Sequence, residues 1–493
     1  MLLHAFFQNT RILPSITYFC GRSILIFLDL GIRSHFFPFF LLSITATAQV
    51  SDFIVVKNIV LFGNKRTKDK IVLREMDIKP QDTIWANTLD TALKTNRNRI
   101  YNTRLFNEVT LTLLPVDTVH QATLLVELKE RWYIFPSPIL ELADRSFNEW
   151  WYNQHRNLTR INYGMRFSDK NFRGRKENLR LTLQGGFTTK LSLGYTVPYL
   201  DKKQRWGMDI NLSYDQNTQI SYKTKENKQQ FLKLDNVLRE RQRYGATFFY
   251  RKSFFGTHSL EIGYNYNQVT DTILKLNPNY FLNGRQSQRY WYFSYDFIYD
   301  KRDVRAYAHR GYYVQVSYDQ NGFTSVDDIR LSVFSGSFAK YLPLGKGFFL
   351  ASSSKGKLYI PNRIPYANMQ ALGYDQNYVR GYDLYVVDGQ AFFLQRATLR
   401  KRLIEGGVDF RSLLNIPQFS TVPFALYLNL YYDAGYTYSN KPYPGNEYLT
   451  NEWLRGGGVG LDLVTYYDSV IRFEYSFNKM LEHHLYLAFT SDI

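Results

Sequence analysis

The sequence predicts a mainly β protein, a 16-stranded antiparallel transmembrane β-barrel preceded by one small α+β domain, and three observations support this prediction. Aromatic residues make up 17% of the 493 residues and charged residues only 21%, a balance that can bury a large core and excludes a disordered chain. Beyond the first ~45 residues, no apolar run reaches the length of a membrane-spanning helix. Instead, apolar and polar residues alternate with a period of two through most of the chain.

The amino terminus has the features of an export signal. Residues 36–44 (FFPFFLLSI) form a short apolar block that follows Arg33 and precedes small residues in an A-x-A arrangement, which signal peptidase accepts. We therefore expect residues 1–48 to be a signal peptide or presequence, cleaved after Ala48. Because this segment is long for such a signal, we expect the true translation start to lie downstream of Met1. A short membrane anchor is the alternative, although the block is too short to span a bilayer.

The charge balance favours anionic partners. The chain carries 61 lysines and arginines against 43 acidic residues, a net charge of +18. An exported basic protein favours outer-membrane lipid head groups or lipopolysaccharide, although a solvated mixed surface accounts for much of this charge. We expect no nucleic-acid partner. Cys20 is the only cysteine, so a disulfide framework and a cysteine-based zinc site are both excluded.

The sequence offers no recognisable catalytic motif. We find no G-x-S-x-G elbow, no H-E-x-x-H and no G-x-x-x-x-G-K-[ST]. The adjacent pair His483 and His484 would face opposite sides of a strand and could not chelate one metal together. We therefore expect a protein that is not an enzyme and needs no cofactor or metal. A hydrolase whose serine and histidine lie on separate strands is a remote alternative.

Residues 53–132 have the pattern of a complete small domain. A strand at 54–62 ends in the turn pair Gly63-Asn64. Thr67 and Asn87 are placed to cap two helices, and strands at 109–113 and 122–128 follow. The predicted order is therefore β-α-α-β-β, which is enough to enclose a core of its own.

This domain resembles a POTRA domain over its whole length. The resemblance rests on an "I-x-L/F-x-G-N" turn at 59–64, an "L-F-x-x-V" start of the second strand at 105–109, and a closing "V-x-L-x-E" at 126–130. The resemblance implies that the domain binds unfolded chains, or periplasmic and lipoprotein partners, by adding a strand to the edge of its sheet. An unrelated α+β domain with the same order of elements is the alternative.

The remainder of the chain predicts the barrel, with a linker at 133–158 and the barrel itself at 159–493. Apolar Ile471, Phe473, Tyr475 and Phe477 alternate with polar residues, and the same split recurs along the chain. We count about 16 such strands, an even number suited to closure. A soluble sandwich with its polar face outward is the alternative. The longest gap between strands, 361–391, is a candidate functional loop.

That loop contains the sequence Tyr-Val-Arg-Gly-Tyr at 378–382, which resembles the V-R-G-F/Y motif of the outer-membrane assembly and translocation superfamily, to which BamA and TamA belong. A strand at 392–402 and a D-x-G strand at 430–435 follow, and then three more strands, at 458–464, 470–477 and 484–490. The stretches 300–303, 310–312 and 171–175 resemble further motifs of this bacterial surface antigen family. The resemblance covers nearly all of the chain after the signal.

The alternation places Asp433 on the lumen face, so a loop folded into the lumen could bring the Arg380 guanidinium to its carboxylate. Gly381 would allow close approach of the backbone. Where the family often has a glutamate partner for this arginine, the chain has Thr398, so Asp433 holds the loop alone or the network is rewired. The candidate site residues are those of the loop-to-lumen pin, Val379, Arg380, Gly381, Tyr382, Asp433 and Gly435, and those of the POTRA turn, Gly63 and Asn64.

The resemblance implies a protein of the outer membrane, with the POTRA domain in the periplasm, that assists the insertion and assembly of outer-membrane proteins or moves polypeptides across the membrane. The implied mechanism is pairing of an incoming strand at the seam between the first strand, expected at 159–167, and the last, at 484–490, after capture of the unfolded client by the POTRA domain. A passive pore or adhesin and a lipid-transfer barrel are the alternatives.

Overall fold

The computed structural model describes residues 53–490, except 117–119, 146, 202, 362, 410–420, 443 and 466–468. The predicted signal peptide at 1–48, its cleavage after Ala48 and the single cysteine Cys20 lie outside the described residues. No helix within the described residues is both long and apolar enough to cross a membrane.

The first described region is a small α+β domain, as predicted. Its elements are β1 (Phe53–Phe62), α1 (Asp69–Leu73), β2 (Thr83–Trp85), α2 (Ala86–Tyr101), β3 (Phe106–Pro115) and β4 (Gln121–Glu130). The sheet order is β2-β1-β4-β3, with β1 and β4 parallel and the other pairs antiparallel. The short edge strand β2 was not expected. Val56, Ile71, Val72, Ile100, Leu124 and Val126 form the buried core between the helices and the sheet.

The two predicted helix caps are wrong. The N-cap residues are Lys68 for α1 and Trp85 for α2, and neither side chain makes a capping hydrogen bond. Asn87 lies inside α2, and the hydroxyl of Thr67 is instead within 2.9 Å of the Tyr133 hydroxyl. The Thr67 side chain therefore makes a tertiary hydrogen bond instead of the helix cap that the local sequence pattern predicted.

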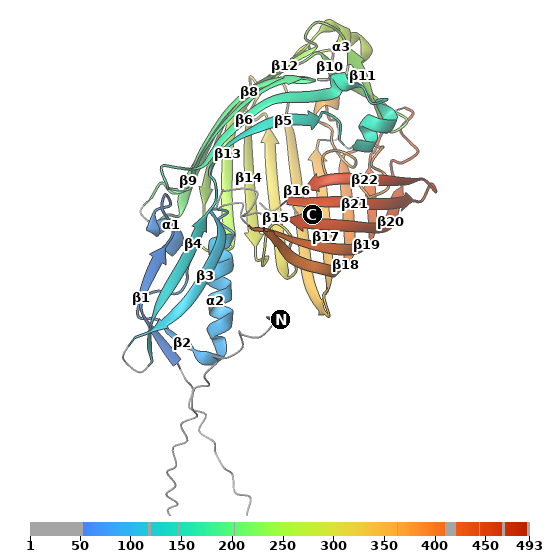
Figure 1. Cartoon of the computed structure of the whole chain (residues 1–493). Helices are drawn as coiled ribbons and strands as arrows, with labels where there is room; N and C mark the ends of the chain where they lie inside the picture. Colours follow the sequence, from blue (N-terminus) through green and yellow to red (C-terminus); the bar gives the residue numbers. More distant parts are fainter. Residues whose placement is uncertain are drawn as a thin grey trace, which may run out of the picture. The chain divides into compact units, whose positions relative to one another are not determined.

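The second region is a 16-stranded antiparallel barrel, which confirms the predicted fold class. Its strands follow one another in chain order around the sheet, which begins at β5 and ends at β22 (Figure 1). They are β5 (Ile134–Leu142), β6 (Ile161–Phe172), β7 (Glu177–Gly186), β8 (Thr188–Val197), β9 (Trp206–Asn217), β12 (Arg239–Tyr250), β13 (Gly256–Val269), β14 (Ser287–Asp300), β15 (Gly311–Asn321), β16 (Leu331–Gly345), β17 (Phe348–Ile360), β18 (Ala391–Asp409), β19 (Thr421–Tyr438), β20 (Trp453–Thr465), β21 (Ser469–Asn478) and β22 (His483–Thr490).

The structure corrects where the barrel begins. The segment 133–158 was expected to be a linker and 159 the start of the barrel, but β5 lies inside that linker and is the first strand of the sheet. The sequence pattern does not predict this strand, because Pro136 and Pro138 are not expected in a central strand. Proline is tolerated in an edge strand, and β5 is one. The predicted seam therefore lies between β5 and β22 rather than between 159–167 and 484–490.

Long connections gather at the end of the barrel away from the POTRA domain, called here the loop end. They include a separate hairpin of β10 (Gln219–Lys225) and β11 (Lys228–Lys233), the helix α3 (Asp271–Leu276), and the segment 361–390. A π-helical turn (Glu149–Asn153) and a 3-10 turn (Leu158–Arg160) lie between β5 and β6, and a further 3-10 turn (Tyr366–Asn368) lies in segment 361–390. Ile220, Leu238, Ile273 and Tyr366 form an apolar cluster that packs these connections together.

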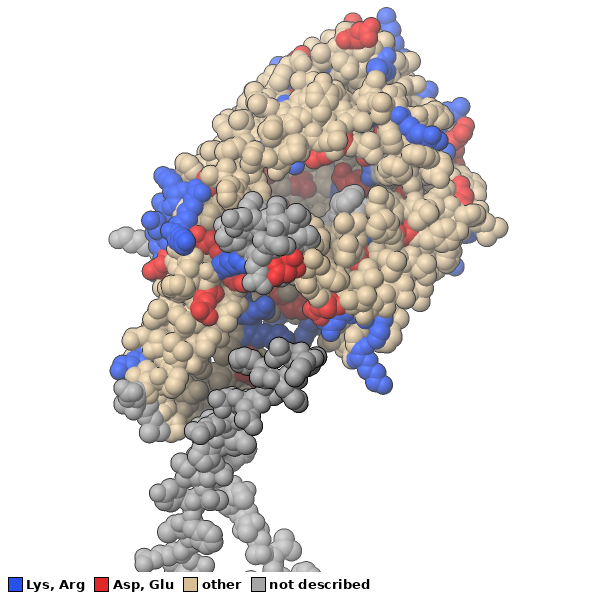
Figure 2. Space-filling model, in the orientation of Figure 1, with Lys and Arg blue, Asp and Glu red and all other residues tan. Residues whose placement is uncertain are grey.

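The barrel sheet carries apolar side chains on its outer face and polar side chains on its inner face, which is the reverse of a soluble protein. On β21, Phe473, Tyr475 and Phe477 are about half exposed on the outside, whereas Glu474 and Ser476 are buried in the lumen. Figure 2 shows the outside of the barrel as a broad surface with few charged residues. A soluble sandwich would show the opposite arrangement, so this inversion favours the membrane barrel over the sandwich.

Candidate functional site

The segment 361–390 joins β17 to β18 and folds back into the lumen. Two isolated bridges, Leu372 with Val387 and Tyr374 with Asn377, give it local structure. Its apolar residues pack with residues of β18 and β20 in a buried cluster of Ala371, Leu372, Val379, Tyr382, Val387, Phe392, Leu394, Leu449 and Leu454. The predicted residues Val379 and Tyr382 thus anchor the loop by burial.

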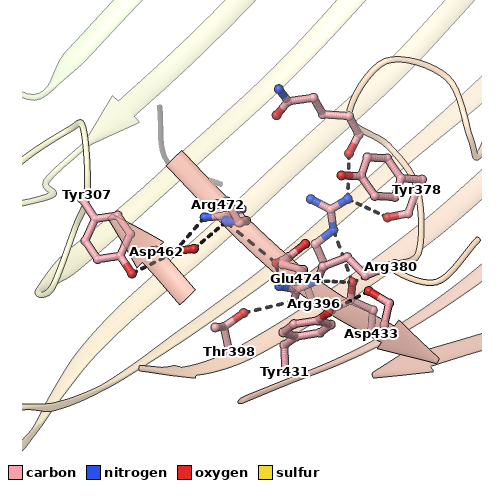
Figure 3. A network of polar contacts seen from close by, with 12 residues as sticks. Tyr307, Tyr378, Arg380, Arg396, Thr398, Tyr431, Asp433, Asp462, Arg472 and Glu474 are labelled. Carbon is pink, nitrogen blue, oxygen red and sulfur yellow. Dashed lines mark hydrogen bonds and ion pairs between the residues drawn. The ribbon is translucent and has the colours of Figure 1, made fainter. Parts of the chain in front are cut away.

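The structure brings Arg380 and Asp433 together. The Arg380 Nε and Nη2 atoms donate to the two carboxylate oxygens of Asp433 over 2.8 and 2.7 Å, and its backbone N–H donates to the same carboxylate over 3.2 Å. Figure 3 shows Arg380 and Asp433 within the surrounding network of polar contacts. The side chains are 7% and 0% exposed, so the pair is shielded from water. Such bidentate contacts fix geometry as well as supplying attraction.

A second carboxylate completes the arginine's surroundings, and the sequence analysis did not find it. Glu474 on β21 accepts from Arg380 Nη1 over 3.1 Å, and the side chain of Tyr431 lies below the guanidinium, 3.8 Å from ring centre to Cζ. Thr398 accepts from Arg380 Nη2 over 3.0 Å. The loop is therefore not held by Asp433 alone. The polar alternation of β21 already placed Glu474 on the lumen face, and only the folded loop shows which residue it faces.

The network extends along the barrel wall on both sides of Arg380. Arg396 donates to the backbone carbonyls of Gln376 and Tyr378 over 2.8 and 2.6 Å. Arg472 pairs with Asp462 over 3.0 Å, and the Tyr307 hydroxyl donates to the same carboxylate over 2.9 Å (Figure 3). These contacts join the loop to the barrel wall and to the connection after β14, through side chains of alternating charge.

Glycines let the loop backbone lie against the wall. Gly381 has a φ of +92°, and a Cβ on Gly456 would lie 1.9 Å from the carbonyl oxygen of Arg380. A Cβ on Gly435 would lie 2.6 Å from Val379 Cγ2. Gly381 and Gly435 were predicted, whereas Gly456 was missed because its role depends on a loop far away in the sequence.

The same loop is tied to both ends of the sheet. After β5, Arg145 donates to the carbonyls of Gly373 and Tyr385 over 2.7 and 2.9 Å, and Asn148 donates to Asp383 over 2.8 Å. Next to β22, the Tyr385 hydroxyl donates to Glu482 over 2.7 Å. The loop therefore bridges the seam at the loop end of the barrel.

The predicted POTRA turn lies where the small domain meets the barrel. Gly63 has a φ of +94°, and Asn64 donates to Asp69 over 2.6 Å. The carboxylate of Glu130, the last residue of the closing motif, accepts the backbone N–H groups of Arg66 and Thr67 over 3.1 and 2.7 Å. The turn is thus fixed by the end of β4.

This turn contacts the first hairpin of the barrel. Asn171 donates to the Thr67 hydroxyl over 2.9 Å, and Arg66 pairs with Asp169 over 2.6 Å. The Lys68 N–H donates to the Gly174 carbonyl over 3.0 Å. The stretch 171–175, which carried part of the sequence resemblance, therefore forms the seat of the POTRA domain.

A second ion pair joins the two regions. Arg251 donates to both oxygens of the buried Glu75 carboxylate over 2.8 and 2.9 Å. Burial alone would raise the pKa of Glu75, but the charges of Arg251, Lys176 and Arg74 outweigh it and hold the pKa at about 2. Glu75 is therefore ionised at neutral pH.

A cavity of about 1050 Å³ lies beside this pair. It is lined by residues of α2 and of the turns at the POTRA end of the barrel. Basic side chains dominate this lining, among them Lys94, Arg99, Lys176, Arg302, Arg305 and Lys340. The cavity is thus suited to anionic groups. No group of three or more residues that could hold a metal ion is found within the described part of the chain.

Comparisons with known proteins agree with this architecture. The family model described as the Omp85 superfamily domain matches residues 171–480, and the POTRA model, described as a surface antigen variable number repeat, matches residues 54–131. No curated protein matches the chain.

Among solved structures, BamA from Haemophilus ducreyi lacking POTRA domains 1–3 is similar, with a TM-score of 0.50 and 16% identity over 89% of this chain and 84% of that one. CdiB from Escherichia coli has a TM-score of 0.49 and 12% identity over 90% of this chain and 91% of that one. The likeness to BamA shows the fold.

Proposed function

The chain belongs to the Omp85 superfamily, and on that premise we propose that it assists the insertion or assembly of β-barrel proteins in an outer membrane, or the passage of polypeptides across it. The barrel lies in the membrane and the POTRA domain in the periplasm. The apolar outer face of the strands and the buried polar lumen support this location.

The observation that carries the proposal is an open sheet. Within the described residues, β5 and β22 form the two ends of the sheet and share no hydrogen-bonded ladder. Unpaired strand edges are templates for another strand. A client strand in the membrane needs hydrogen-bond partners for its backbone N–H and C=O groups, and pairing at this seam supplies them. No nucleotide or metal is needed, because client burial and backbone pairing supply the driving force.

The POTRA domain adds a capture site outside the membrane. Strand β3 is an edge strand of its sheet and pairs with no further strand within the described residues, so an extended segment of an unfolded client or of a periplasmic or lipoprotein partner can add there. The basic cavity next to α2 lies on the route from this domain to the barrel and would attract acidic stretches of such a chain.

The loop in the lumen argues against a simple open pore. On one side Arg380 is bound to β19 and β21, and on the other the Tyr366 hydroxyl is within 2.6 Å of the Ser221 hydroxyl on the β10–β11 hairpin. Segment 361–390 therefore crosses the lumen. A passive pore of steady conductance would require this segment to leave its place.

The test is reconstitution of the processed protein in lipid vesicles with several unfolded outer-membrane proteins as clients. Client folding is followed by protease protection, and ion conductance and lipid transfer are measured in parallel. We expect faster client folding that is lost in Arg380→Ala and kept in Arg330→Ala, a matched change of an exposed arginine. Folded barrels that accelerate none of the clients would contradict the proposal and favour the pore or the lipid-transfer barrel.

A further inference from the structure

The cavity beside the Arg251–Glu75 pair has one wall from the POTRA domain and one from the barrel. On the POTRA side it is lined by residues of α2, namely Thr91, Lys94, Thr95, Asn98 and Arg99. These positions recur every three or four residues, so they form one polar face of the helix. On the barrel side the lining comes from residues between 300 and 312 and from 340–343, at the ends of β14, β15 and β16 nearest the POTRA domain. A ligand in this cavity would therefore contact both parts of the chain.

The carboxylates in the cavity lining are already bound. Nine of the lining side chains are lysine or arginine, whereas three are acidic, Glu75, Asp300 and Asp303. The Glu75 carboxylate binds Arg251, as described above. Asp300 binds Arg302 and Arg305 over 2.9 and 3.0 Å, and Asp303 accepts two backbone N–H groups of its own turn over 3.1 and 3.2 Å. The lining therefore has a surplus of positive charge that its own carboxylates do not neutralise.

Several of the lining cations have no partner of their own. Within the described residues, the side chains of Lys94, Lys176 and Arg310 form no ion pair and no hydrogen bond. Burial lowers the pKa of Lys176 to about 8, although the charge of Glu75 opposes this, and neighbouring arginines contribute to the lowering. An anion bound in the cavity would relieve the repulsion among these cations and stabilise their charged forms.

The cavity also reaches the outer face of the barrel. On β16, Phe338 is about half exposed on the outside and the next residue, Ala339, is buried, so Lys340 points outward again. Lys340 is paired in register with Tyr312 of β15, and its Nζ atom lies 5.4 Å from the centre of the Tyr312 ring. Both side chains line the cavity. Aromatic and basic side chains at a strand end are typical of the boundary between membrane and water.

From Lys340 toward the loop end, the outer surface is apolar. Phe338 and Phe334 on β16 and Val316 on β15 are each about half exposed. A cationic cavity thus adjoins an apolar wall, and this combination fits an amphiphile with an anionic head group. A free phosphate or an acidic peptide would use the charges but leave the apolar wall uncovered. The cavity, of about 1050 Å³, is large enough for a head group.

We propose that this cavity binds the anionic, phosphate-bearing head group of one phospholipid from the membrane leaflet on the POTRA side. Lys94 of the POTRA domain and Arg310 and Lys340 of the barrel bind the phosphate, and the acyl chains lie along Phe338 and Phe334. Phosphate oxygens accept charge-assisted hydrogen bonds from several cations at once, so the lipid holds α2 against the end of the barrel. The site goes beyond the proposed function, because it requires no client.

The test measures lipid retention by the full processed chain in a neutral detergent, using native mass spectrometry. Phosphatidylglycerol is the anionic probe, and phosphatidylcholine with the same acyl chains is the zwitterionic control. When the two lipids are added in equal amounts, we expect the chain to retain one molecule of phosphatidylglycerol and to lose phosphatidylcholine.

Substitutions locate the site. With Lys94→Gln, Arg310→Gln and Lys340→Gln combined, we expect phosphatidylglycerol to bind at least about tenfold more weakly, because three cations near the head group are removed. The matched control removes the same charge from three exposed residues at the loop end, Lys233→Gln, Lys275→Gln and Arg330→Gln. We expect this control to retain the lipid like the unchanged protein.

A photoreactive head group on phosphatidylglycerol gives a second measurement that needs no substitution. We expect its cross-links to fall on peptides from both α2 and residues 301–312. If the triple variant does not fold, this measurement decides the question, and cross-links confined to other peptides would reject the site.

Each other outcome would overturn the inference in a distinguishable way. Equal retention of the two lipids, or equal binding by the triple variant and its control, would show ordinary boundary lipid. Displacement of the lipid by inorganic phosphate at the same concentration would make free phosphate the ligand. Displacement by a glutamate-rich peptide would make an acidic polypeptide the ligand. Because no client is present, each of these results leaves the proposed function standing.

Discussion

Two of the buried arginine–carboxylate pairs, Arg380–Asp433 and Arg251–Glu75, connect parts of the molecule that are distant in sequence, and they differ in what surrounds them. Arg380 and Asp433 lie in the lumen among apolar loop residues and are 7% and 0% exposed. Arg251 and Glu75 join the barrel to the POTRA domain, where the arginine is 20% exposed and a large basic cavity adjoins the pair. The same bidentate contact therefore makes a closed pin in the lumen and a joint beside a large cavity at the POTRA domain.

Two ion pairs with the same bidentate geometry can therefore have different roles, because burial and neighbouring charges also determine what each pair contributes. Removing one partner from a dry site leaves an uncompensated buried charge, whereas water and neighbouring charges can relieve the loss at a hydrated site. We therefore expect the lumen pin to control stability of the loop and the joint to control attachment of the POTRA domain. Four substitutions test this contrast.

The largest effect is expected for Arg380→Ala. The change leaves the carboxylates of Asp433 and Glu474 buried without their main partner, which should cost about 3–5 kcal/mol. Thermal unfolding in detergent and protease cleavage within 361–390 measure the effect. Arg330→Ala is the control. An Arg380→Ala protein as stable and protease-resistant as the control would show that the lumen is wet and the contrast false.

Glu75→Gln should have a smaller effect with a distinct pH dependence. Because the pKa of Glu75 is lowered from 4.5 to about 2, its contribution to stability is present above pH 4.5 and is lost as the pH falls toward 2. We expect a loss of about 2 kcal/mol at pH 7, reduced by the partial exposure of Arg251. Unfolding curves between pH 3 and pH 7 should converge for the two proteins at the acid end. Curves that stay parallel would contradict the assignment.

Gly456→Ala tests how closely the loop backbone approaches the wall. The new Cβ would lie 1.9 Å from the Arg380 carbonyl oxygen, so the loop must shift, at a cost of about 1–3 kcal/mol. Gly336→Ala is the matched control, because the nearest atom there is 3.7 Å away. Unfolding midpoints of the two variants give the comparison, and equal values would show that the loop yields without cost.

The smallest effect is expected for Thr398→Val. This nearly isosteric change removes the hydroxyl that accepts from Arg380 Nη2 over 3.0 Å, at a cost of about 1 kcal/mol, while both carboxylates stay in place. Double-mutant analysis with Arg380→Ala measures the coupling. If Thr398→Val were as damaging as Arg380→Ala, the carboxylates would not be the main partners of the arginine.

Several features of the fold followed from local pattern. The alternation on β19 and β21 was enough to place Asp433 and Glu474 in the lumen, since side chains of a strand point to opposite faces in turn. The gap between β17 and β18 was visible as the longest stretch without alternation. Strand β5 does not follow from local pattern, because its prolines are typical of a linker. The role of Thr67 does not either, because its partners, Tyr133 and Asn171, are remote in sequence.

The sequence by itself determined the fold class, the lumen-facing residues and the loop that carries Arg380, because each depends on periodicity or on a short motif. Only the tertiary structure decided that Glu474 and Tyr431 complete the arginine's surroundings, that Gly456 admits its backbone, and that β5 and β22 form the two ends of the sheet. These features depend on which distant strands and loops become neighbours, and that is set by closure of the sheet and its register.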